Sequence, residues 1–390
     1  MIRYFTSGES HGRGISVIAY GFPANIPVDI DYINNELSRR QKGYGRGARM
    51  KIETDTADII GGVRNGKTIG SPISMVVWNK DWENWKNKVV PKVTKPRPGH
   101  ADLTGVLKYG FDDIRDVLER ASARETSARV AVGALAKYVL EKFFDVKIFS
   151  HVVVFGGIQV DLTGLTYKEV MENSLNSEVG VGNPKFEEEI KKYIDRVKSE
   201  GDTLGGVIEV VVLNTPVGLG SYVHWEDKID ARIAYAVMSI QAIKGIEFGM
   251  GFRLGFIRGS QVHDEISWNG RRFVRTSNNA GGIEGGMTNG EPIVFRCVMK
   301  PISTLMKPKK SVDIFTKEEF LAHVERSDVT AVPSAGVVVE SVVAIELLSA
   351  ILKRYGQDNI ELIKKIFDSD EIQTNRTGLE IINRLYGETS

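Results

Sequence analysis

Runs of apolar residues that end at glycine, proline or polar positions recur along the chain, and such runs are typical of β-strands. They predict strands over 14–20, 72–78, 147–155, 206–213 and 292–299. Elsewhere apolar residues stand three or four positions apart, as in an amphipathic helix; within 29–41, Ile30, Ile33 and Leu37 share one face. Similar patterns predict helices over 113–144, 184–200, 226–240, 335–353 and 359–385.

The order of these elements bears on the fold class. Strands and helices do not alternate regularly, so a doubly wound parallel sheet is not expected. Helix pairs stand between groups of strands, which favours a layered α+β architecture. No internal repeat and no Pro/Ser-rich linker divides the sequence. We therefore expect a single compact domain over residues 1–390.

Composition places the chain among soluble globular proteins, with 42% hydrophobic and 26% charged residues in 390. No uninterrupted run of about 18 apolar residues exists, so no membrane-spanning helix is expected. The first residues lack the apolar core of a signal peptide. The lone cysteine, Cys297, lies in an apolar run and is expected to be buried. These features favour the cytoplasm.

The net charge of +1 gives no global attraction to nucleic acid or membrane, yet cations gather locally. Residues 39–51 hold six cations and no acid, in a glycine-rich loop that carries Arg40, Arg46 and Arg49. One guanidinium group can bind two oxygens of a phosphate or carboxylate at once, so this loop could close over a small anionic substrate. The alternative is that these cations are simply exposed to solvent and bind no ligand. A nucleic-acid patch is a third, although Tyr44 is the only aromatic residue interleaved.

Two histidines lie in unusual surroundings. Glycines and small residues flank His11 in TSGESHGRG, which suits either a proton donor close to substrate or an ordinary polar loop. Prolines and a glycine precede His100 in KPRPGHADLTG, and Asp102 follows it. His100 is either a positioned acid–base group or an incidental loop residue.

Three further segments could bind anions. Helical spacing in 118–140 would put Arg120 and Arg124 on adjacent turns; the alternative is helix packing with surface ion pairs from Glu119 and Glu125. Glycines at 281–286 could offer backbone N–H groups to an anion or a flavin. Asp328, two residues after an arginine, is either half of a local ion pair or a base in a cavity.

The sequence contains no pattern typical of a metal site or of a nucleophilic serine. The six histidines show no ligand spacing, and a single cysteine cannot form a thiolate site, so no metal site is expected. No GxSxG segment suggests a serine nucleophile.

Five of these segments, taken in order, resemble the chorismate synthase family: GESHG, RRQKGYGRGARM, RPGHAD, ERASARET and RSDVTAVP. The resemblance runs from residue 2 to about 345, and 346–390 form a helical C-terminal tail with less family signal. It implies a carbon–oxygen lyase of the shikimate pathway, which makes aromatic amino acids. The family reaction is the anti-1,4-elimination of phosphate from 5-enolpyruvylshikimate 3-phosphate to give chorismate, and it requires reduced FMN. The implied fold is a single-domain β-α-β sandwich assembled as a homotetramer, with no nucleic-acid or membrane partner.

The resemblance also assigns roles to residues. His11 would protonate the departing phosphate, His100 would stabilise the reduced flavin, and Asp328 would be the base that takes the C6 proton by way of the flavin. The implied substrate-binding residues are Ser10, Arg40, Arg46, Arg49, Arg124 and Arg326. The implied FMN-binding residues are Arg120, Ser122, Gln241, Ala242, Gly285, Gly286, Lys300, Pro301, Ile302, Ser303, Thr304 and Arg326.

Departures from the family pattern leave some roles open. Ala121 stands where many relatives have serine, and Phe111 stands where many have histidine. Glu9 could orient His11 or pair with an arginine. Some relatives reduce their flavin with NADPH and others use an external reductant; no added reductase domain is visible here, which favours the second. A non-enzymatic nucleic-acid-binding protein is the main alternative, and a phosphotransferase lacks a Walker motif.

Overall fold

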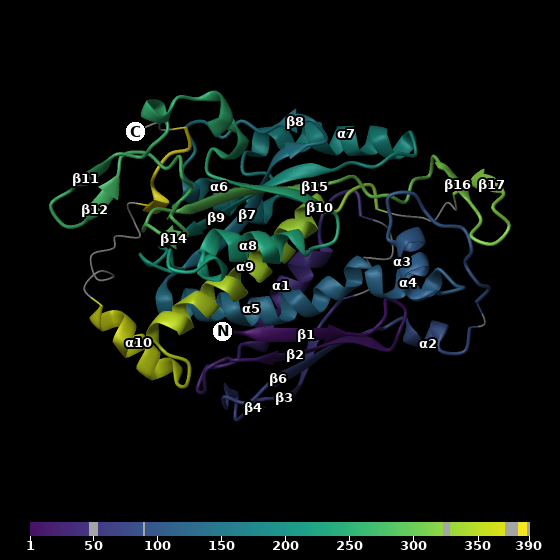
Figure 1. Ribbon diagram of the computed structural model, residues 1–390, viewed down its shortest axis with the longest axis horizontal. Coiled ribbons are helices and arrows are strands. Elements are labelled where there is room, and N and C mark those ends of the chain that lie inside the picture. Colours follow the sequence, from purple (N-terminus) through teal and green to yellow (C-terminus); the bar gives the residue numbers. More distant parts are fainter. Residues whose placement is uncertain (47–53, 89, 323–327, 371–380, 388–390) are drawn as a thin grey trace.

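The computed structural model describes residues 1–46, 54–88, 90–322, 328–370 and 381–387. Two antiparallel sheets enclose a layer of helices (Figure 1). The first sheet has the order β1 (Arg3–Ser7), β2 (Gly14–Tyr20), β6 (Ile73–Trp78) and β3 (Ala57–Gly61). The second has the order β10 (Ile243–Phe248), β15 (Ile293–Met299), β9 (Gly206–Leu213), β7 (Lys147–Phe155) and β8 (Ile158–Gln159).

The helices between the sheets are α1 (Ile30–Gln41), α5 (Thr126–Phe144), α8 (Ile229–Met238) and α9 (Val332–Tyr355). On the far side of the second sheet lie α6 (Tyr167–Asn176) and α7 (Glu187–Ser199), and α10 (Ile360–Ser369) packs against α9 and α5 (Figure 1). One end of the molecule carries α2 (Trp82–Trp85), α3 (Asp102–Tyr109) and α4 (Arg115–Ala121). The predicted layered α+β architecture is confirmed.

Four short hairpins lie outside the two sheets in the described part of the chain. They are β4 (Val63–Arg64) with β5 (Lys67–Thr68), β11 (Ile266–Trp268) with β12 (Phe273–Arg275), β13 (Ile283–Glu284) with β14 (Met287–Thr288), and β16 (Lys310–Val312) with β17 (Glu319–Leu321).

The predicted strands are confirmed to within one residue at each end, but the continuous helix predicted over 113–144 is wrong. Ser122 is extended, with φ −64° and ψ 140°, and separates α4 from the 3-10 turn Ala123–Glu125 that leads into α5. The Ser122 hydroxyl accepts a hydrogen bond from the N–H of Arg124 at 3.3 Å, so it caps the new turn. Arg120 and Arg124 therefore do not lie on adjacent turns of one helix.

Helix α9 is the centre of the core, in contact with α1, α5, α8, β7 and β9. By length and composition it could cross a membrane, with a mean hydropathy of 2.1 over 18 residues, but 89% of that window is buried inside the protein. Its closest neighbour is α5. A Cβ added to Gly133 of α5 would lie 2.4 Å from the Cβ of Ser341, so only glycine permits this approach. Residues 346–355 of the predicted tail belong to this buried helix.

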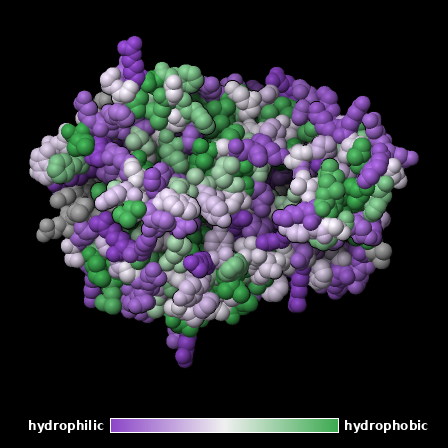
Figure 2. Space-filling model, viewed as in Figure 1, coloured by the Kyte–Doolittle hydropathy of each residue, from purple (hydrophilic) through white to green (hydrophobic). Residues whose placement is uncertain are grey.

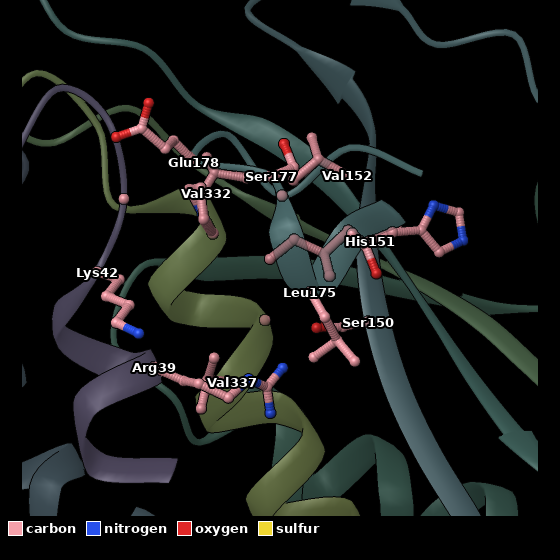
Figure 3. A pocket seen from close by; sticks show the side chains of 16 residues that line it. Arg39, Lys42, Ser150, His151, Val152, Leu175, Ser177, Glu178, Val332 and Val337 are labelled. Carbon is pink, nitrogen blue, oxygen red and sulfur yellow. The ribbon is translucent and has the colours of Figure 1, made fainter. Parts of the chain in front are cut away.

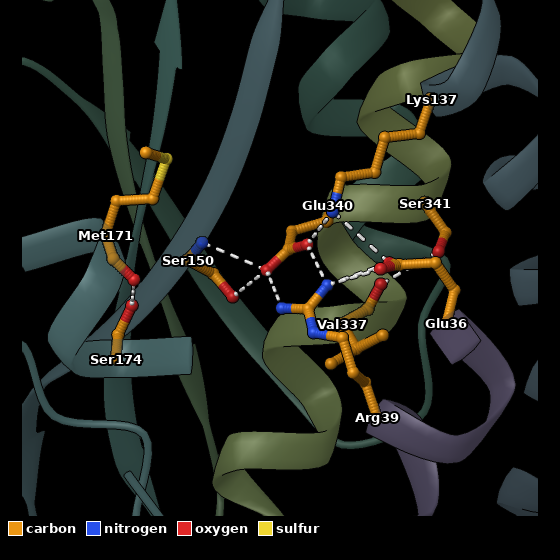
Figure 4. A network of polar contacts seen from close by, with 9 residues as sticks. All are labelled: Glu36, Arg39, Lys137, Ser150, Met171, Ser174, Val337, Glu340 and Ser341. Carbon is orange, nitrogen blue, oxygen red and sulfur yellow. Dashed lines mark hydrogen bonds and ion pairs between the residues drawn. The ribbon is translucent and has the colours of Figure 1, made fainter. Parts of the chain in front are cut away.

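Two cations and two anions are buried together where α1, α5, α9 and β7 meet (Figure 4). Glu340 of α9 accepts hydrogen bonds from Arg39 (2.9 Å), Lys137 (2.6 Å) and the Ser150 hydroxyl (2.6 Å). Glu36 pairs with the same two cations, at 2.8 Å and 3.2 Å. Burial alone would raise the pKa of Glu340, but attraction to Arg39 and Lys137 lowers it below its usual range.

Cys297 on β15 is 1% exposed, as predicted, and burial raises the pKa of its thiol to about 12. A thiol of such low acidity is a packing residue and not a nucleophile.

Candidate active site

His11 lies in the loop between β1 and β2 and is held by α4. Its backbone N–H donates to Glu119 Oε2 at 2.7 Å, and its Nδ1 lies 2.8 Å from Oε1 of the same carboxylate. The N–H of Ser10 donates to the carbonyl of Glu119 at 3.0 Å. Burial alone would raise the pKa of Glu119, but the hydrogen bonds from His11 lower it. Glu119 therefore holds His11 at both its backbone and its ring, and its side chain is only 16% exposed, which speaks against the alternative of a surface ion pair from Glu119.

Three arginines meet at the C-terminal end of α1. Arg40 is buried and donates to Asp55 Oδ2 at 2.5 Å and to the Thr126 hydroxyl at 3.4 Å. Arg124 approaches the other oxygen of Asp55 at 3.8 Å. A single buried carboxylate thus bridges two guanidinium groups, so the cluster keeps a positive charge.

Arg46 joins this cluster from the glycine-rich loop. It donates to the Ser334 hydroxyl at 2.9 Å, and its Nε lies 3.2 Å from Asp328 Oδ2. Burial lowers the pKa of Arg46; Asp328 opposes that effect and the nearby Arg40 adds to it. Asp328 is consequently a carboxylate at the edge of a cationic site, and its side chain is 24% exposed.

The second histidine lies in a separate polar cluster. His100 Nδ1 lies 3.3 Å from both Arg97 and the buried Asp102. Arg97 also donates to Asp102 from its Nε at 2.9 Å. Burial would raise the pKa of Asp102, yet the hydrogen bonds from His100 and Arg97 hold it far below the usual range. The ionised carboxylate of Asp102 therefore stabilises the turn that carries His100.

The segment predicted to bind FMN packs against this turn. Lys300 Nζ and the Ser303 hydroxyl donate to the carbonyl of Gly99 at 2.8 and 2.9 Å, and Arg97 reaches the Thr304 hydroxyl at 3.4 Å. The backbone N–H of Lys300 donates to Ala242 at 3.0 Å. Burial and the nearby Lys244 lower the pKa of Lys300. Pro301 and Ile302 follow in the same segment, where the carbonyl of Ile302 accepts from Thr203 at 2.7 Å.

A series of hydrogen bonds through Glu125 and Thr6 of β1 connects Gln241 with Arg120. The Gln241 amide donates to Glu125 at 3.2 Å, and Glu125 also accepts from the Thr6 hydroxyl at 2.7 Å. Arg120 donates to that hydroxyl oxygen at 2.7 Å. Glu125 is 4% exposed, and its ion pair with Arg129 at 3.0 Å is buried, which speaks against the alternative of a surface ion pair from Glu125. Segments from four parts of the sequence therefore meet at one end of the helix layer.

Comparison with known proteins shows which family has this arrangement. A sequence model of the family described as chorismate synthase matches residues 2–352. The chain is 56% identical over 376 residues to the chorismate synthase of Streptococcus sanguinis, covering 93% of this chain and 97% of that protein. It is 55% identical over 383 residues to the chorismate synthase of Streptococcus mutans, covering 95% and 98%. A crystal structure of chorismate synthase matches with a TM-score of 0.79 and 45% identity over 96% of this chain and 98% of that one.

The chain belongs to the chorismate synthase family. Chorismate synthases are lyases that eliminate phosphate in the shikimate pathway of aromatic amino acid biosynthesis, and use of reduced flavin is general to the family. The alternative of a non-enzymatic nucleic-acid-binding protein finds no support in these comparisons.

Not every residue carried over from chorismate synthases joins these clusters. The N–H of Ile229 donates to the Gly286 carbonyl at 2.9 Å, which places Gly285 and Gly286 at the N-terminal end of α8. Gln241 follows the C-terminal end of that helix, and ten helical residues span about 15 Å. Arg49 and Arg326 lie outside the described residues.

A solvent-open pocket lies between the end of α1 and the start of α9 (Figure 3). Arg39, Lys42 and Glu178 line it, and in Figure 3 the His151 ring points away from the other side chains. His151 instead lies 3.1 Å from the buried Glu209 on the far face of the sheet. Neither His11, His100 nor Asp328 is among the described residues that line this pocket.

Proposed function

We propose that the arginine cluster and the two histidine clusters form one active site, at which phosphate is eliminated from 5-enolpyruvylshikimate 3-phosphate to give chorismate. The convergence of Arg40, Arg46 and Arg124 carries this proposal. Arg40 is 7% exposed, and its Nε has no hydrogen-bond partner among the described residues. A buried donor without a partner is costly, and an anionic ligand would relieve that cost. Arg49 and Arg326 are expected to extend the same binding surface.

His11 is proposed to donate a proton to the leaving phosphate. A phosphate leaves more easily when it is protonated or held by cations, and the arginine cluster and His11 can supply both effects. Ser10, the neighbour of His11, offers a hydroxyl for the substrate. The hydrogen bonds that Glu119 accepts from the N–H groups of both residues fix the loop that carries them.

Asp328 is proposed to hold the proton lost from C6 of the substrate. Its contact with Arg46 keeps the carboxylate beside the substrate-binding arginines, where it can accept a proton as the elimination proceeds.

Reduced FMN is proposed to bind near His100, Gln241 and Lys300. When bound, it supplies electron density that helps the carbon–oxygen bond to break. Gln241 Oε1 is a buried acceptor without a hydrogen-bond partner among the described residues, which suits a cofactor edge with N–H donors. Lys300, with its lowered pKa, and the hydroxyls of Ser303 and Thr304 would bind polar groups of the cofactor. His100, Arg120, Ser122 and Ala242 complete the proposed surface, and Gly285 and Gly286 stay predictions.

An anaerobic assay tests the proposed function. The protein is mixed with FMN, dithionite and 5-enolpyruvylshikimate 3-phosphate, and the absorbance of chorismate is followed. We expect turnover with dithionite-reduced FMN and none with oxidised FMN. A second arm replaces dithionite by NADPH and is expected to stay inactive, because an external reductant is proposed. A folded protein that gives no chorismate with dithionite would contradict the function; turnover with NADPH would contradict only the proposed reductant.

A cytoplasmic homotetramer is proposed as the working assembly. The outer face of the first sheet exposes a row of apolar side chains: Phe5 is 80% exposed, Tyr20 60% and Ile18 53%. Phe5 and Ile18 are cross-strand partners, so they form a continuous apolar surface. Light scattering is expected to give four times the mass of one chain, and Phe5→Asp is expected to lower that mass. A monomeric parent protein would exclude the assembly.

A further inference from the structure

We infer that Glu119 is the positioning residue for His11, fixing its ring orientation and holding a proton on Nδ1 so that Nε2 is the atom that donates. Both oxygens of one carboxylate contact the same residue, one at the backbone N–H (2.7 Å) and one at the ring (2.8 Å). Two such contacts fix the backbone and the side chain of His11 together. The inference rests on the proposed role of His11 as the acid.

The chemistry of the contact decides which ring nitrogen carries the proton. An ionised carboxylate only accepts hydrogen bonds, and the hydrogen bonds from His11 favour ionised Glu119 by lowering its pKa. Nδ1 must therefore be the donor, so the neutral ring carries its proton on Nδ1. The protonated ring carries a second proton on Nε2, and its loss returns the ring to the neutral form that Glu119 already holds.

Trp85 restricts the ring from a second direction. The His11 and Trp85 rings lie 4.1 Å apart between centroids, with an angle of 36° between their planes. The Trp85 indole N–H donates to Asp81 at 2.8 Å, which fixes the indole in place. His11 is therefore held at an edge by Glu119 and on a face by Trp85, and both contacts depend on segments far from it in sequence.

Glu119→Gln is the decisive variant because it preserves shape and removes the charge. The backbone N–H of His11 is always a donor, so the glutamine oxygen must face it. The glutamine NH2 group then faces Nδ1 and favours the neutral ring with its proton on Nε2. Such a ring is a poor acid, since loss of that proton would leave an imidazolate.

The test combines NMR of protein with ¹⁵N-labelled histidine and steady-state kinetics. His11 signals are assigned by their loss in His11→Gln. We expect the Nδ1–H tautomer in the parent protein and the Nε2–H tautomer in Glu119→Gln. We also expect kcat at least about tenfold lower in Glu119→Gln, with little change in KM. Asp116→Asn removes an exposed carboxylate from the same helix and is expected to change neither measurement.

The outcomes separate the inference from the proposed function. An Nε2–H tautomer in the parent protein would overturn the inference even if Glu119→Gln did not fold. An unchanged tautomer in folded Glu119→Gln would overturn it as well. Full turnover in His11→Gln would instead refute the proposed acid, whatever the tautomer.

Discussion

Replacing His11 by glutamine, or Asp328 by asparagine, is expected to lower kcat by about 10²- to 10⁴-fold while reduced FMN still binds. Glutamine can still donate to Glu119 but does not supply a proton to the phosphate. Asparagine can still accept from Arg46 but is not a base. Each variant thus removes proton transfer and keeps the local hydrogen bond. The rate is measured by the anaerobic chorismate assay, and binding of reduced FMN is measured under the same anaerobic conditions by the change in its absorbance on titration with protein.

A matched control accompanies this pair. His224→Gln changes an exposed histidine outside the three clusters and is expected to leave the rate unchanged. If His11→Gln or Asp328→Asn keeps a rate within about threefold of the parent, that residue does not transfer a proton in a rate-determining step. Loss of FMN binding in either variant would assign the residue to the cofactor site.

Replacing Lys137 by methionine is expected to lower the free energy of unfolding by about 3–5 kcal/mol, the usual cost of removing one partner from a buried ion pair. Methionine fills a similar volume, so the loss is mainly electrostatic. Glu36 and Glu340, both buried, would share one cation, Arg39 (Figure 4). Denaturation in urea, followed by circular dichroism, measures the change.

Two further variants test the electrostatic explanation. Lys142→Met removes an exposed lysine from the same helix and is expected to cost less than about 1 kcal/mol, the range for a cation near a helix C-terminus. Adding Glu36→Gln to Lys137→Met restores a neutral cluster and is expected to recover part of the stability. A double variant less stable than Lys137→Met would show that packing, not charge, sets the cost.

Patterns within short segments predicted the fold well. The run 206–213 is apolar except for Glu209 because β9 is buried on both faces, and its limits were readable to the residue. The strand β10 was missed because Gly245 and charged residues interrupt its apolar pattern. Ser122 ends α4 within a sequence whose residues otherwise favour a helix, so the break could not be predicted from the pattern of residues.

The reactive groups of the candidate site could be predicted from the sequence. The carboxylates that hold those groups in position could not. Arginines and histidines in glycine-rich segments are conspicuous in a sequence. Their carboxylate partners are not: Glu119 is 108 positions from His11, and Asp55 is 15 positions from Arg40. No periodicity or spacing rule connects such pairs, because the contact exists only after the sheets and helices have packed. Glu119 was visible only as a charge on a helix.

The central position of α9 sets a constraint on synthesis in the cell. The first sheet and α5 are complete by Phe144, yet the helix that covers the other face of α5 begins only at Val332. A ribosome adds roughly 5–20 residues per second, so the apolar face of α5 waits about 10–40 seconds for its partner. During that interval the nascent chain depends on protection from aggregation. Synonymous codons that slow translation between these two helices would lengthen the exposure without changing the protein.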